Sequence, residues 1–415
     1  MSKLQELIDR LCPDGVEFGK LGDYIDIYTG SQFNKRDMND AGSYPVINGG
    51  VNASGYIESF NEEAKTITIS QGGASAGYVA WQETPFWAGA HCYVVRPSSS
   101  AVLNRFLYFF LKNQEVYLQQ MQHGAGIPAL NRDKVKSLLF PLVPIEVQEE
   151  IVKILDRFAD YAAELQAELQ AELQARRLQY EYYRNLLLTF NPSAYGCGTD
   201  DAQKISVIAR GGHSYEIQWK TMGEIGTFIR GNGLQKKDFT ESGVGCIHYG
   251  QIYTHYGTFA DKTISFVSKE ASNNFRKAKP GDLVIATTSE NVDDVCKCVA
   301  WLGKEEIAVS SDAFIFHHNL NPKYAAYFFQ TDCFQKQKLP FVTGTKVMRV
   351  SSDNLAKILI PIPPLELQEK IVAILDRFDT LVNDLSKGLP AEIEAVKARY
   401  EYYRNKLLTF NPLSA

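Results

Sequence analysis

The feature that most constrains this chain is an internal repeat with a constant offset of 220 residues. Residues 141–158, PLVPIEVQEEIVKILDRF, match residues 361–378, PIPPLELQEKIVAILDRF, at twelve of eighteen positions. Residues 180–192, YEYYRNLLLTFNP, match residues 400–412, YEYYRNKLLTFNP, at twelve of thirteen positions. Because both pairs share one offset, the segments between them have equal length although their sequences differ. We therefore expect a duplicated structural unit.

The repeated segments predict two long helices. From about residue 146 to 188, apolar residues such as Ile151, Leu155 and Leu165 recur every three or four positions and so form one helical face. Prolines precede both helices, and an Asn-Pro pair follows each of them, at 191–192 and 411–412. An apolar seam on each helix predicts an antiparallel coiled coil. The sequence KGLP at residues 387–390 predicts a break or kink in the second helix.

The rest of each half predicts a mixed α/β domain, or head. Short β-rich runs at 43–47, 66–70, 77–81 and 92–95 alternate with turn residues, and one helix follows at 101–122. The second half repeats the mixed β pattern at 220–319 and the helix at 323–338. Weak matches relate 19–23 to 220–224, 28–30 to 229–231, and 66–70 to 283–287. The expected fold class is α+β, with two pseudo-repeated α/β domains at 1–145 and 201–360, a central helix at 146–200 and a C-terminal helix at 361–415.

Composition and charge limit the class of protein. A chain of 415 residues with 45% hydrophobic residues is long enough for two globular domains. No uncharged apolar stretch predicts a membrane span or a signal peptide, and seven scattered cysteines favour a reduced, cytosolic protein. The net charge is −5, with −5 on residues 146–200 and +3 on residues 201–360. Phosphate neutralisation supplies most non-specific DNA affinity, so a DNA-binding chain with this balance needs a more basic partner.

The motifs of common enzymes are absent from the sequence. It has no phosphate-binding loop and no dinucleotide fingerprint. Residues 191–194, NPSA, lack the aromatic fourth residue of the amino-methyltransferase loop, and Asp14, Glu17 and Lys20 have the wrong spacing for a nuclease cluster. Cys296-Lys297-Cys298 does not have zinc-ligand spacing. We expect no catalytic residue, metal or cofactor, and a function in binding.

Polar and cationic side chains that can hydrogen-bond base edges concentrate in glycine-bearing loops at equivalent places in both heads. These loops are 29–36, 70–75 and 123–132 in the first head, and 230–237, 248–251, 287–291 and 343–349 in the second. The recurrence of the loops carries this prediction, because for any single residue in them an ordinary solvated loop is the better interpretation. The candidate DNA-binding residues are Ser31, Gln32, Lys35, Arg36, Gln71, Ser75, Arg132, Arg230, Lys236, Lys237, Tyr249, Gln251, Thr288, Asn291, Lys346 and Arg349.

Residues 163–174 consist of three copies of the tetrapeptide AELQ. Each copy adds about 6 Å of helix and about 40° of rotation beyond a full turn. Two interpretations stay open at this point: a low-complexity helix with an acidic face, or a spacer whose copy number sets the separation of the heads.

The segments 361–378, 388–393 (GLPAEI) and 400–404 (YEYYR) resemble the conserved regions of type I restriction–modification specificity subunits, and the AELQ copies resemble the spacer repeats of that family. The resemblance implies a non-catalytic chain with two target-recognition domains, each reading half of a bipartite site in double-stranded DNA. It also implies two methyltransferase subunits docked on the helices, and ATP-dependent restriction subunits. Methyl transfer from S-adenosylmethionine and DNA cleavage would belong to those partners. Heads related by an antiparallel helix pair would meet the duplex in opposite senses, as half-sites about one helical turn, 34–36 Å, apart require. The candidate partner-binding residues are Gln148, Arg157, Tyr183, Arg184, Gln368, Arg377, Tyr403 and Arg404.

Two other hypotheses compete with this one. In the first, the chain is a non-catalytic scaffold whose helices bind partners and whose heads bind protein. In the second, it is a stand-alone DNA-binding repressor, which the net charge of −5 disfavours.

Overall fold

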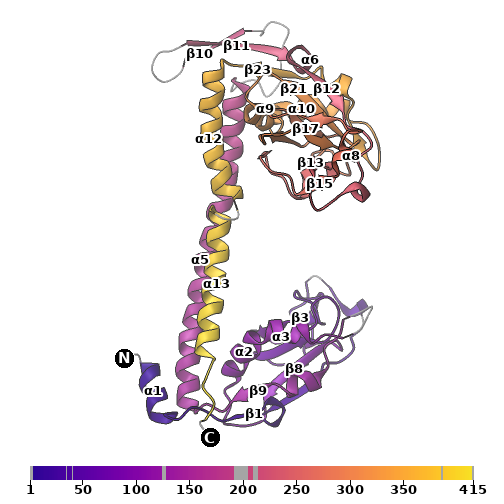
Figure 1. Cartoon of the computed structure of the whole chain (residues 1–415). Coiled ribbons are helices and arrows are strands. Elements are labelled where there is room, and N and C mark those ends of the chain that lie inside the picture. The colour runs from indigo at the N-terminus through magenta and orange to yellow at the C-terminus, as the bar shows by residue number, and fades with distance from the viewer. Residues whose placement is uncertain are drawn as a thin grey trace. The chain divides into compact units, whose positions relative to one another are not determined.

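The computed structural model describes residues 3–33, 35–39, 41–123, 128–190, 204–208, 214–384 and 387–413. It forms two compact units, which are described separately here with the element labels of Figure 1. Unit 1 contains residues 1–170 and 392–415, and unit 2 contains residues 171–391. Each unit therefore combines one head with parts of both repeated helical regions. The boundary at 170/171 falls inside the central helix, whereas the four-part division drawn from the repeat stays a prediction.

The head of unit 1 contains three small sheets (Figure 1). The first is antiparallel, in the order β2-β8-β5-β6, with bounds Ile25–Thr29, Cys92–Pro97, Thr66–Ser70 and Val79–Gln82. The second has the order β4-β3-β7, with bounds Tyr56–Ile57, Tyr44–Ile47 and Trp87–Ala88. The third pairs β1, Phe18–Lys20, with β9, Leu139–Pro141. The helices are α1 (Lys3–Leu11), α2 (Asn104–Asn113), α3 (Glu115–Gln120), α4 (Arg132–Lys136), the first part of α5 (Ile145–Thr189) and most of α13 (Leu389–Leu407).

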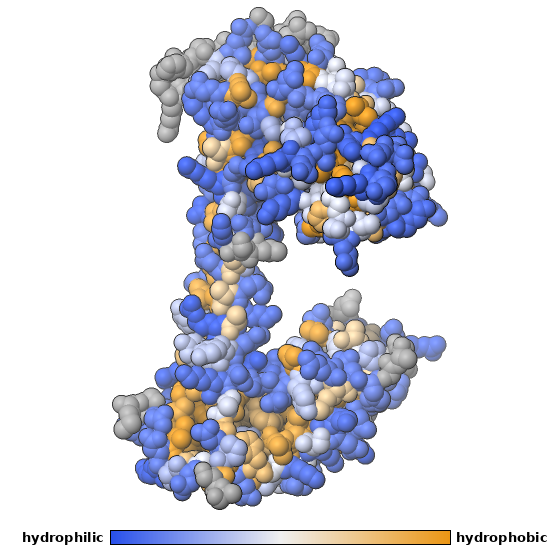
Figure 2. Space-filling view, in the orientation of Figure 1, coloured by the Kyte–Doolittle hydropathy of each residue, from blue (hydrophilic) through white to orange (hydrophobic). Residues whose placement is uncertain are grey.

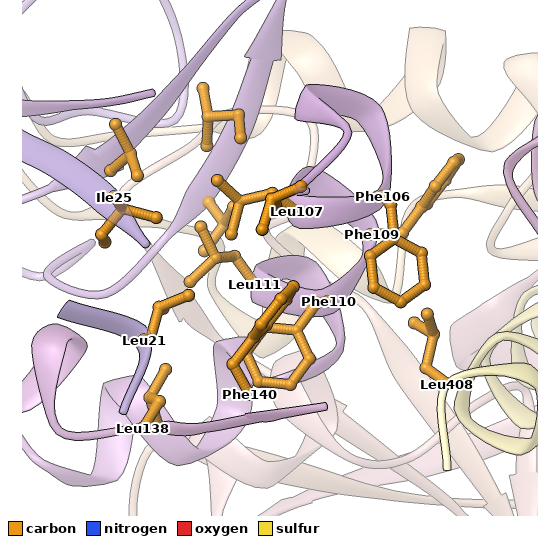
Figure 3. Packing of buried hydrophobic residues seen from close by; sticks show 14 of the residues in the cluster. Leu21, Ile25, Phe106, Leu107, Phe109, Phe110, Leu111, Leu138, Phe140 and Leu408 are labelled. Atoms are coloured by element: carbon orange, nitrogen blue, oxygen red, sulfur yellow. The ribbon is translucent and has the colours of Figure 1, made fainter. Parts of the chain in front are cut away.

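The core of unit 1 ties the head to the end of the chain. Phe106 and Phe110 of α2 contact the ring of Phe140 in β9, with centroids 5.9 and 5.0 Å apart. Leu408, directly after α13, belongs to the same buried cluster (Figure 3). Val16 N–H donates to Asn411 O, 2.9 Å, so residues near both ends of the chain pack together in this unit.

The head of unit 2 contains four sheets. The largest has the order β12-β21-β17-β19-β14, with bounds Gly226–Arg230, Ala313–His318, Leu283–Ala286, Cys298–Trp301 and Phe259–Ala260. The next has the order β15-β13-β20-β16, with bounds Ser265–Val267, Val244–Ile247, Ile307–Val309 and Lys277–Ala278. The smaller sheets are β10-β11-β23 (Lys204–Ile208, Ser214–Thr221, Leu359–Ile362) and β18-β22 (Thr288–Ser289, Met348–Arg349). The helices are α6 (Met222–Ile225), α7 (Tyr249–Thr254), α8 (Lys269–Ser272), α9 (Pro322–Phe328), α10 (Asp332–Lys338), α11 (Ser352–Leu355), α12 (Leu365–Asn383) and the rest of α5.

The two heads share a common strand order, to which the head of unit 2 adds β14 and β16, and this shared order confirms the predicted duplication. The order β2-β8-β5-β6 corresponds to β12-β21-β17-β19, and β4-β3-β7 corresponds to β15-β13-β20. The pairs β3–β7 and β13–β20 are both parallel. A Cβ atom at Gly30 would lie 2.2 Å from Ala88 O, and one at Gly231 would lie 2.1 Å from Ser310 O. Both glycines therefore follow the first strand of the main sheet because the neighbouring turn leaves no room for a side chain.

The two predicted short helices are each divided into two. Helix α2 ends at Asn113 and α3 begins at Glu115, while α9 ends at Phe328 and α10 begins at Asp332. In the second head, the Thr331 side chain accepts a hydrogen bond from Phe334 N–H and caps a new helix. The aromatic periodicity continues across both breaks, so the sequence pattern did not reveal them.

The starts of the long helices follow the prolines, as predicted, and their ends agree with the prediction where the structure describes them. The N–H groups of Gln148 and Gln368 donate to the carbonyls of Pro144 and Pro364, so α5 and α12 begin in the same way. Helix α5 spans 45 residues and ends at Thr189, where Phe190 adopts a left-handed backbone with φ 53°. The expected stop at 191–192 lies outside the described residues. The expected break at 387–390 is confirmed, because α12 ends at Asn383 and α13 begins at Leu389.

Helix α5 pairs with a different helix in each unit. In unit 1, Phe158 of α5 contacts Tyr403 of α13, with ring centroids 5.7 Å apart. Leu165 and Val396 line the same groove further along, so residue numbers rise on one helix as they fall on the other, as an antiparallel pair requires. In unit 2, Tyr183 of α5 stacks on Phe378 of α12, with centroids 5.5 Å apart.

Replacing Gly388 by valine should destabilise unit 2. A Cβ atom at Gly388 would lie 2.4 Å from Thr380 O in the last turn of α12. We expect the free energy of unfolding to fall by about 1–3 kcal/mol, as overpacking commonly costs, when urea denaturation of the full chain is monitored. Gly257→Val is the control, since a Cβ atom there has nothing within 4 Å. Equal losses in the two variants would contradict the assigned role of Gly388.

Candidate DNA interface and partner surfaces

In unit 1, one turn connects the predicted DNA-binding loops. Residues 88–92 join β7 to β8, and their carbonyl groups accept hydrogen bonds from two of the loops. Ser31 N–H donates to Ala88 O, 2.8 Å, and Gln71 N–H donates to His91 O, 2.9 Å. The third loop joins through Leu130 N–H, which donates to Gln71 O, 2.8 Å. Residues 124–127 of this loop lie outside the described residues. The described parts of all three loops meet at one edge of the main sheet.

Unit 2 repeats this arrangement with different side chains. Residues 310–313 form the turn between β20 and β21. Ser310 Oγ accepts from Tyr249 N–H, 2.8 Å, and the carbonyl of Asp312 accepts from Thr287 N–H, 2.9 Å. The predicted loop 343–349 is connected to the loop 287–291 by the strand pairing of Arg349 with Thr288. The predicted loops are therefore gathered at the same edge in both heads.

The candidate residues differ in accessibility. The exposed ones in unit 1 are Ser31, Gln32, Lys35, Arg36 and Arg132. The exposed ones in unit 2 are Arg230, Lys236, Lys237, Asn291, Lys346 and Arg349. Gln71, Ser75, Tyr249 and Gln251 are half-buried, and Thr288 is buried. Cations thus dominate the exposed set in unit 2, although Arg230 lies 3.6 Å from the Asp312 carboxylate and donates to Ser311 O.

Two candidates have internal roles in this structure. Gln251 Oε1 accepts from His248 N–H, 2.9 Å, and its Nε2 donates to Ser265 Oγ, 2.7 Å, so the amide holds the start of α7. Residues 248–251, expected as a loop, instead form the first turn of this helix. Thr288 is 7% exposed and lies in β18. Neither side chain is presented to DNA in this conformation.

Gln148 and Gln368, both predicted to contact a partner, are buried in this structure, at 1% and 3% exposed. Gln148 Oε1 accepts from Leu103 N–H, 2.9 Å, and its Nε2 donates to Val143 O, 2.7 Å. Gln368 makes the equivalent bonds with Asn321 N–H and Pro363 O, both 2.8 Å. Each glutamine therefore fastens a long helix to its own head.

Other repeated residues also make matching contacts inside the units. Arg404 Nε donates to Asn113 Oδ1, 3.4 Å, and Arg184 Nη1 donates to Gln330 Oε1, 3.2 Å. Tyr183 and Tyr403 pack on the phenylalanines already described. Arg157 and Arg377 are exposed, so they alone among the eight candidates fit an accessible surface without a described internal contact.

The sequence interpretation missed two helix-to-head ion pairs. Arg105 of α2 lies 2.8 Å from Asp156 of α5, and Lys323 of α9 lies 2.7 Å from Asp376 of α12. Both aspartates belong to the identical segments, and the basic residues occupy equivalent positions near the starts of their helices. The only sign in the sequence is that opposite charges occur at matching positions in both repeats. The fold is needed to show that these charges are in contact.

A smaller set of repeated residues is exposed in both copies. Tyr182 and Tyr402 are 57% and 61% exposed, and each touches only the adjacent tyrosine among the ring contacts described. The helices otherwise show mainly hydrophilic residues in Figure 2, with isolated hydrophobic ones. Within the two segments of high identity, 141–158 with 361–378 and 180–190 with 400–410, the exposed identical pairs are Glu146 and Glu366, Glu149 and Glu369, Arg157 and Arg377, Glu181 and Glu401, and Tyr182 and Tyr402; we call them the repeated surface set.

The described residues contain no group of three or more side chains suited to a metal ion. Burial raises the pKa of the Cys246 and Cys296 thiols to about 12, which opposes formation of a thiolate nucleophile. Within the same residues, no helix has both the length and the apolar character needed to cross a membrane.

Two heads of one topology that present different polar loops from a repeated helical support define a two-domain recognition protein. The sequence matches the family described as Type I restriction modification DNA specificity domain over residues 13–175 and 216–395. A Haemophilus influenzae protein named as a type I restriction enzyme specificity subunit is 31% identical over 91% of both chains. The EcoR124I/EcoR124II specificity subunit of Escherichia coli is 26% identical over 99% of this chain and 97% of its own. A solved structure concerned with assembly and conformational transition of the type I R-M system shares the fold, with TM-score 0.63, 15% identity, and coverage of 95% of this chain and 98% of the other.

The chain belongs to the type I restriction–modification DNA specificity family and is a specificity subunit with two target-recognition domains.

Replacing Gln148 by leucine should destabilise unit 1. The variant leaves Leu103 N–H and Val143 O without their partner, and an unsatisfied buried polar group costs about 1–3 kcal/mol. We expect a loss of this size in the free energy of unfolding, measured by urea denaturation. The control is Glu149→Gln at the adjacent exposed position, which should stay within about 0.5 kcal/mol of the wild type. A Gln148→Leu variant as stable as this control would rule out the fastening role.

Proposed function

We propose that this specificity subunit reads a bipartite site in double-stranded DNA, with each head contacting one half-site. The observation that carries the proposal is the gathering of equivalent loops at the same sheet edge in both heads. Their backbone connections repeat, whereas their side chains differ. A common frame with different polar side chains suits two different base sequences, because base edges are distinguished by the pattern of donors and acceptors.

The chain supplies recognition, and its partners supply the chemistry. The net charge of −5 and the acidic helices leave little capacity for phosphate neutralisation by this chain alone. Two methyltransferase subunits would provide S-adenosylmethionine-dependent methylation and additional positive charge. Restriction subunits would add ATP-dependent cleavage, all in the cytoplasm.

The repeated surface set is the docking surface proposed for the two methyltransferase subunits. Internal packing accounts for Gln148, Asp156 and Arg404 and for their counterparts. It does not account for the identity of exposed Tyr182 and Tyr402. Two copies of one partner would impose the same residues on both sites, and exposed tyrosines are frequent anchors in protein interfaces.

The three AELQ copies are proposed to set the half-site spacing. Residues 163–174 are wholly helical within α5, and Leu165, Leu169 and Leu173 are half-buried while the glutamates are exposed. A change in copy number alters helix length in steps of about 6 Å without changing either head.

The scaffold hypothesis is disfavoured by family membership. It predicts no sequence-dependent DNA binding with or without a methyltransferase subunit, whereas the stand-alone repressor predicts tight specific binding by the chain alone. A gel-shift assay with both preparations separates them from the specificity subunit, which needs its partner for tight specific binding.

Deleting one AELQ copy, residues 171–174, should shorten the recognised spacer by about one or two base pairs. This follows from about 6 Å of helix and about 3.4 Å per base pair. Sequencing of methylated adenines in cells that express the assembled methyltransferase measures the motif. The length-neutral control Gln174→Ala should keep the wild-type spacer. An unchanged spacer after the deletion would refute the spacing role, and a wild-type motif with only one recognised block would refute the bipartite site.

Replacing Tyr182 and Tyr402 by alanine should weaken assembly with the methyltransferase subunit at least tenfold. Each single variant should impair one of two docking sites, so native mass spectrometry at limiting partner should show a 1:1 complex. Tyr161→Ala is the matched control, because Tyr161 is 65% exposed on α5 but its counterpart is Leu381. Wild-type assembly by the double variant, or equal loss in the control, would exclude the repeated surface set as the docking surface.

A further inference from the structure

The loop between β17 and β19, one of the candidate DNA-binding loops in unit 2, is held by several hydrogen bonds along its length. Residues 287–297 carry the exposed candidate Asn291, whose Oδ1 accepts from Asp293 N–H, 2.9 Å. Tyr253 Oη donates to Thr288 O, 3.0 Å, at one end of the loop. At the other end, Cys296 has a left-handed backbone with φ 73°. The loop thus has a defined conformation, which raises the question of what maintains it.

Lys338 supplies the main support beneath this loop. It is the last residue of α10, and it is 1% exposed. Its Nζ donates to Val292 O, Asp293 O and Val295 O, at 2.9, 3.0 and 3.0 Å. An ammonium group has three donors, and here the loop carbonyls take all three.

A lysine this deeply buried is rare, because removing its charge from water is costly. Burial lowers the pKa of Lys338, while Cys296, Asp293 and Asp294 around it act in the opposite direction. If this position served only to pack the core, an apolar side chain would suffice, as Phe334 does on the same helix. All the described hydrogen bonds of the Lys338 side chain are with carbonyl groups of the loop.

The first head has a corresponding contact made by a different residue. Gln122 follows α3, which is the counterpart of α10, and its Nε2 donates to Ala76 O, 2.5 Å. Ala76 belongs to the loop between β5 and β6, which carries the candidates Gln71 and Ser75. Neither Gln122 nor Lys338 lies in the segments of high repeat identity. The same support therefore occurs twice in the fold without being part of the repeated sequence.

We propose that Lys338 and Gln122 are positioning residues for sequence specificity, each fixing the loop through which its head reads one half-site. This inference rests on the proposed function of the loops. Helix α10 is itself held in the core by Cys333 and Phe334, so Lys338 couples the loop to a rigid element. A loop fixed before binding discriminates between bases because displaced donors and acceptors cannot be readjusted to a wrong base without loss.

The test uses the full chain assembled with its methyltransferase subunit. Lys338→Met keeps the length of the side chain and removes its three donors. Lys336→Met is the matched control, with the same change in charge on the same helix at an exposed position. Methylation rates on oligonucleotides with single changes in each half-site give the specificity of each head, and amide hydrogen exchange of the same complexes reports on loop 287–297.

Lys338→Met should lower discrimination at one half-site at least tenfold and leave the other half-site unchanged. Amide exchange should accelerate in loop 287–297 while β17 and β19 keep wild-type rates. Gln122→Leu should produce the complementary result, with loss at the opposite half-site. If Lys338→Met fails to assemble, Gln122→Leu alone decides, because this residue is only half-buried.

Three results would overturn the proposal. The first is faster loop exchange with unaltered discrimination at both half-sites, and the second is unaltered exchange with unaltered discrimination. The third is equal loss at both half-sites, which indicates general destabilisation. A wild-type complex that recognises no bipartite site would instead refute the proposed function, and the exchange measurement would still show whether Lys338 holds the loop.

Discussion

The pairing of each helical segment with a segment from the other repeat is the constraint on which the rest of the structure depends. Phe158 of the first repeat packs on Tyr403 of the second, and Phe378 of the second packs on Tyr183 of the first. The same contact is thus made twice, each time between repeats. Each contact joins one residue from each repeat, so the same combination of phenylalanine and tyrosine satisfies the packing at both places.

This explanation changes the meaning of the repeat. Near-identity suggests two identical docking sites, and the sequence interpretation assigned all eight conspicuous residues to partners. The buried glutamines and the Asp156 and Asp376 ion pairs show that a large part of the identity serves attachment of the helices to the heads. The docking surface proposed for partners is therefore limited to repeated residues that are exposed, among them Tyr182 and Tyr402.

The sequence could predict the α+β class, the duplication, the antiparallel helices and the break near Gly388, because repeats, apolar periodicity and helix-stop residues are local or strictly periodic signals. It could also place the candidate loops, since they follow strands. It could not predict the breaks at Gln114 and Thr331, where apolar periodicity continues across a change of direction. Nor could it separate Gln148 from Arg157, because which polar side chain lies inward depends on contacts with α2. Lys338 was missed for the opposite reason: nothing nearby in the sequence marks a lysine whose acceptors lie more than forty residues away.

The unequal charge of the heads fits a subunit that works only within an assembly. The exposed candidate cations are more numerous in unit 2 than in unit 1, and the regions 1–145 and 201–360 carry −2 and +3. Base contacts supply discrimination, whereas phosphate contacts supply most affinity, and a net charge of −5 suits the second task poorly. An unassembled specificity subunit that gripped DNA tightly would occupy target sites without modifying them and would shield them from the complete complex. Under the proposed function, weak DNA affinity of the free chain combined with reading loops held in place avoids this competition, because discrimination becomes effective only when a partner adds phosphate contacts.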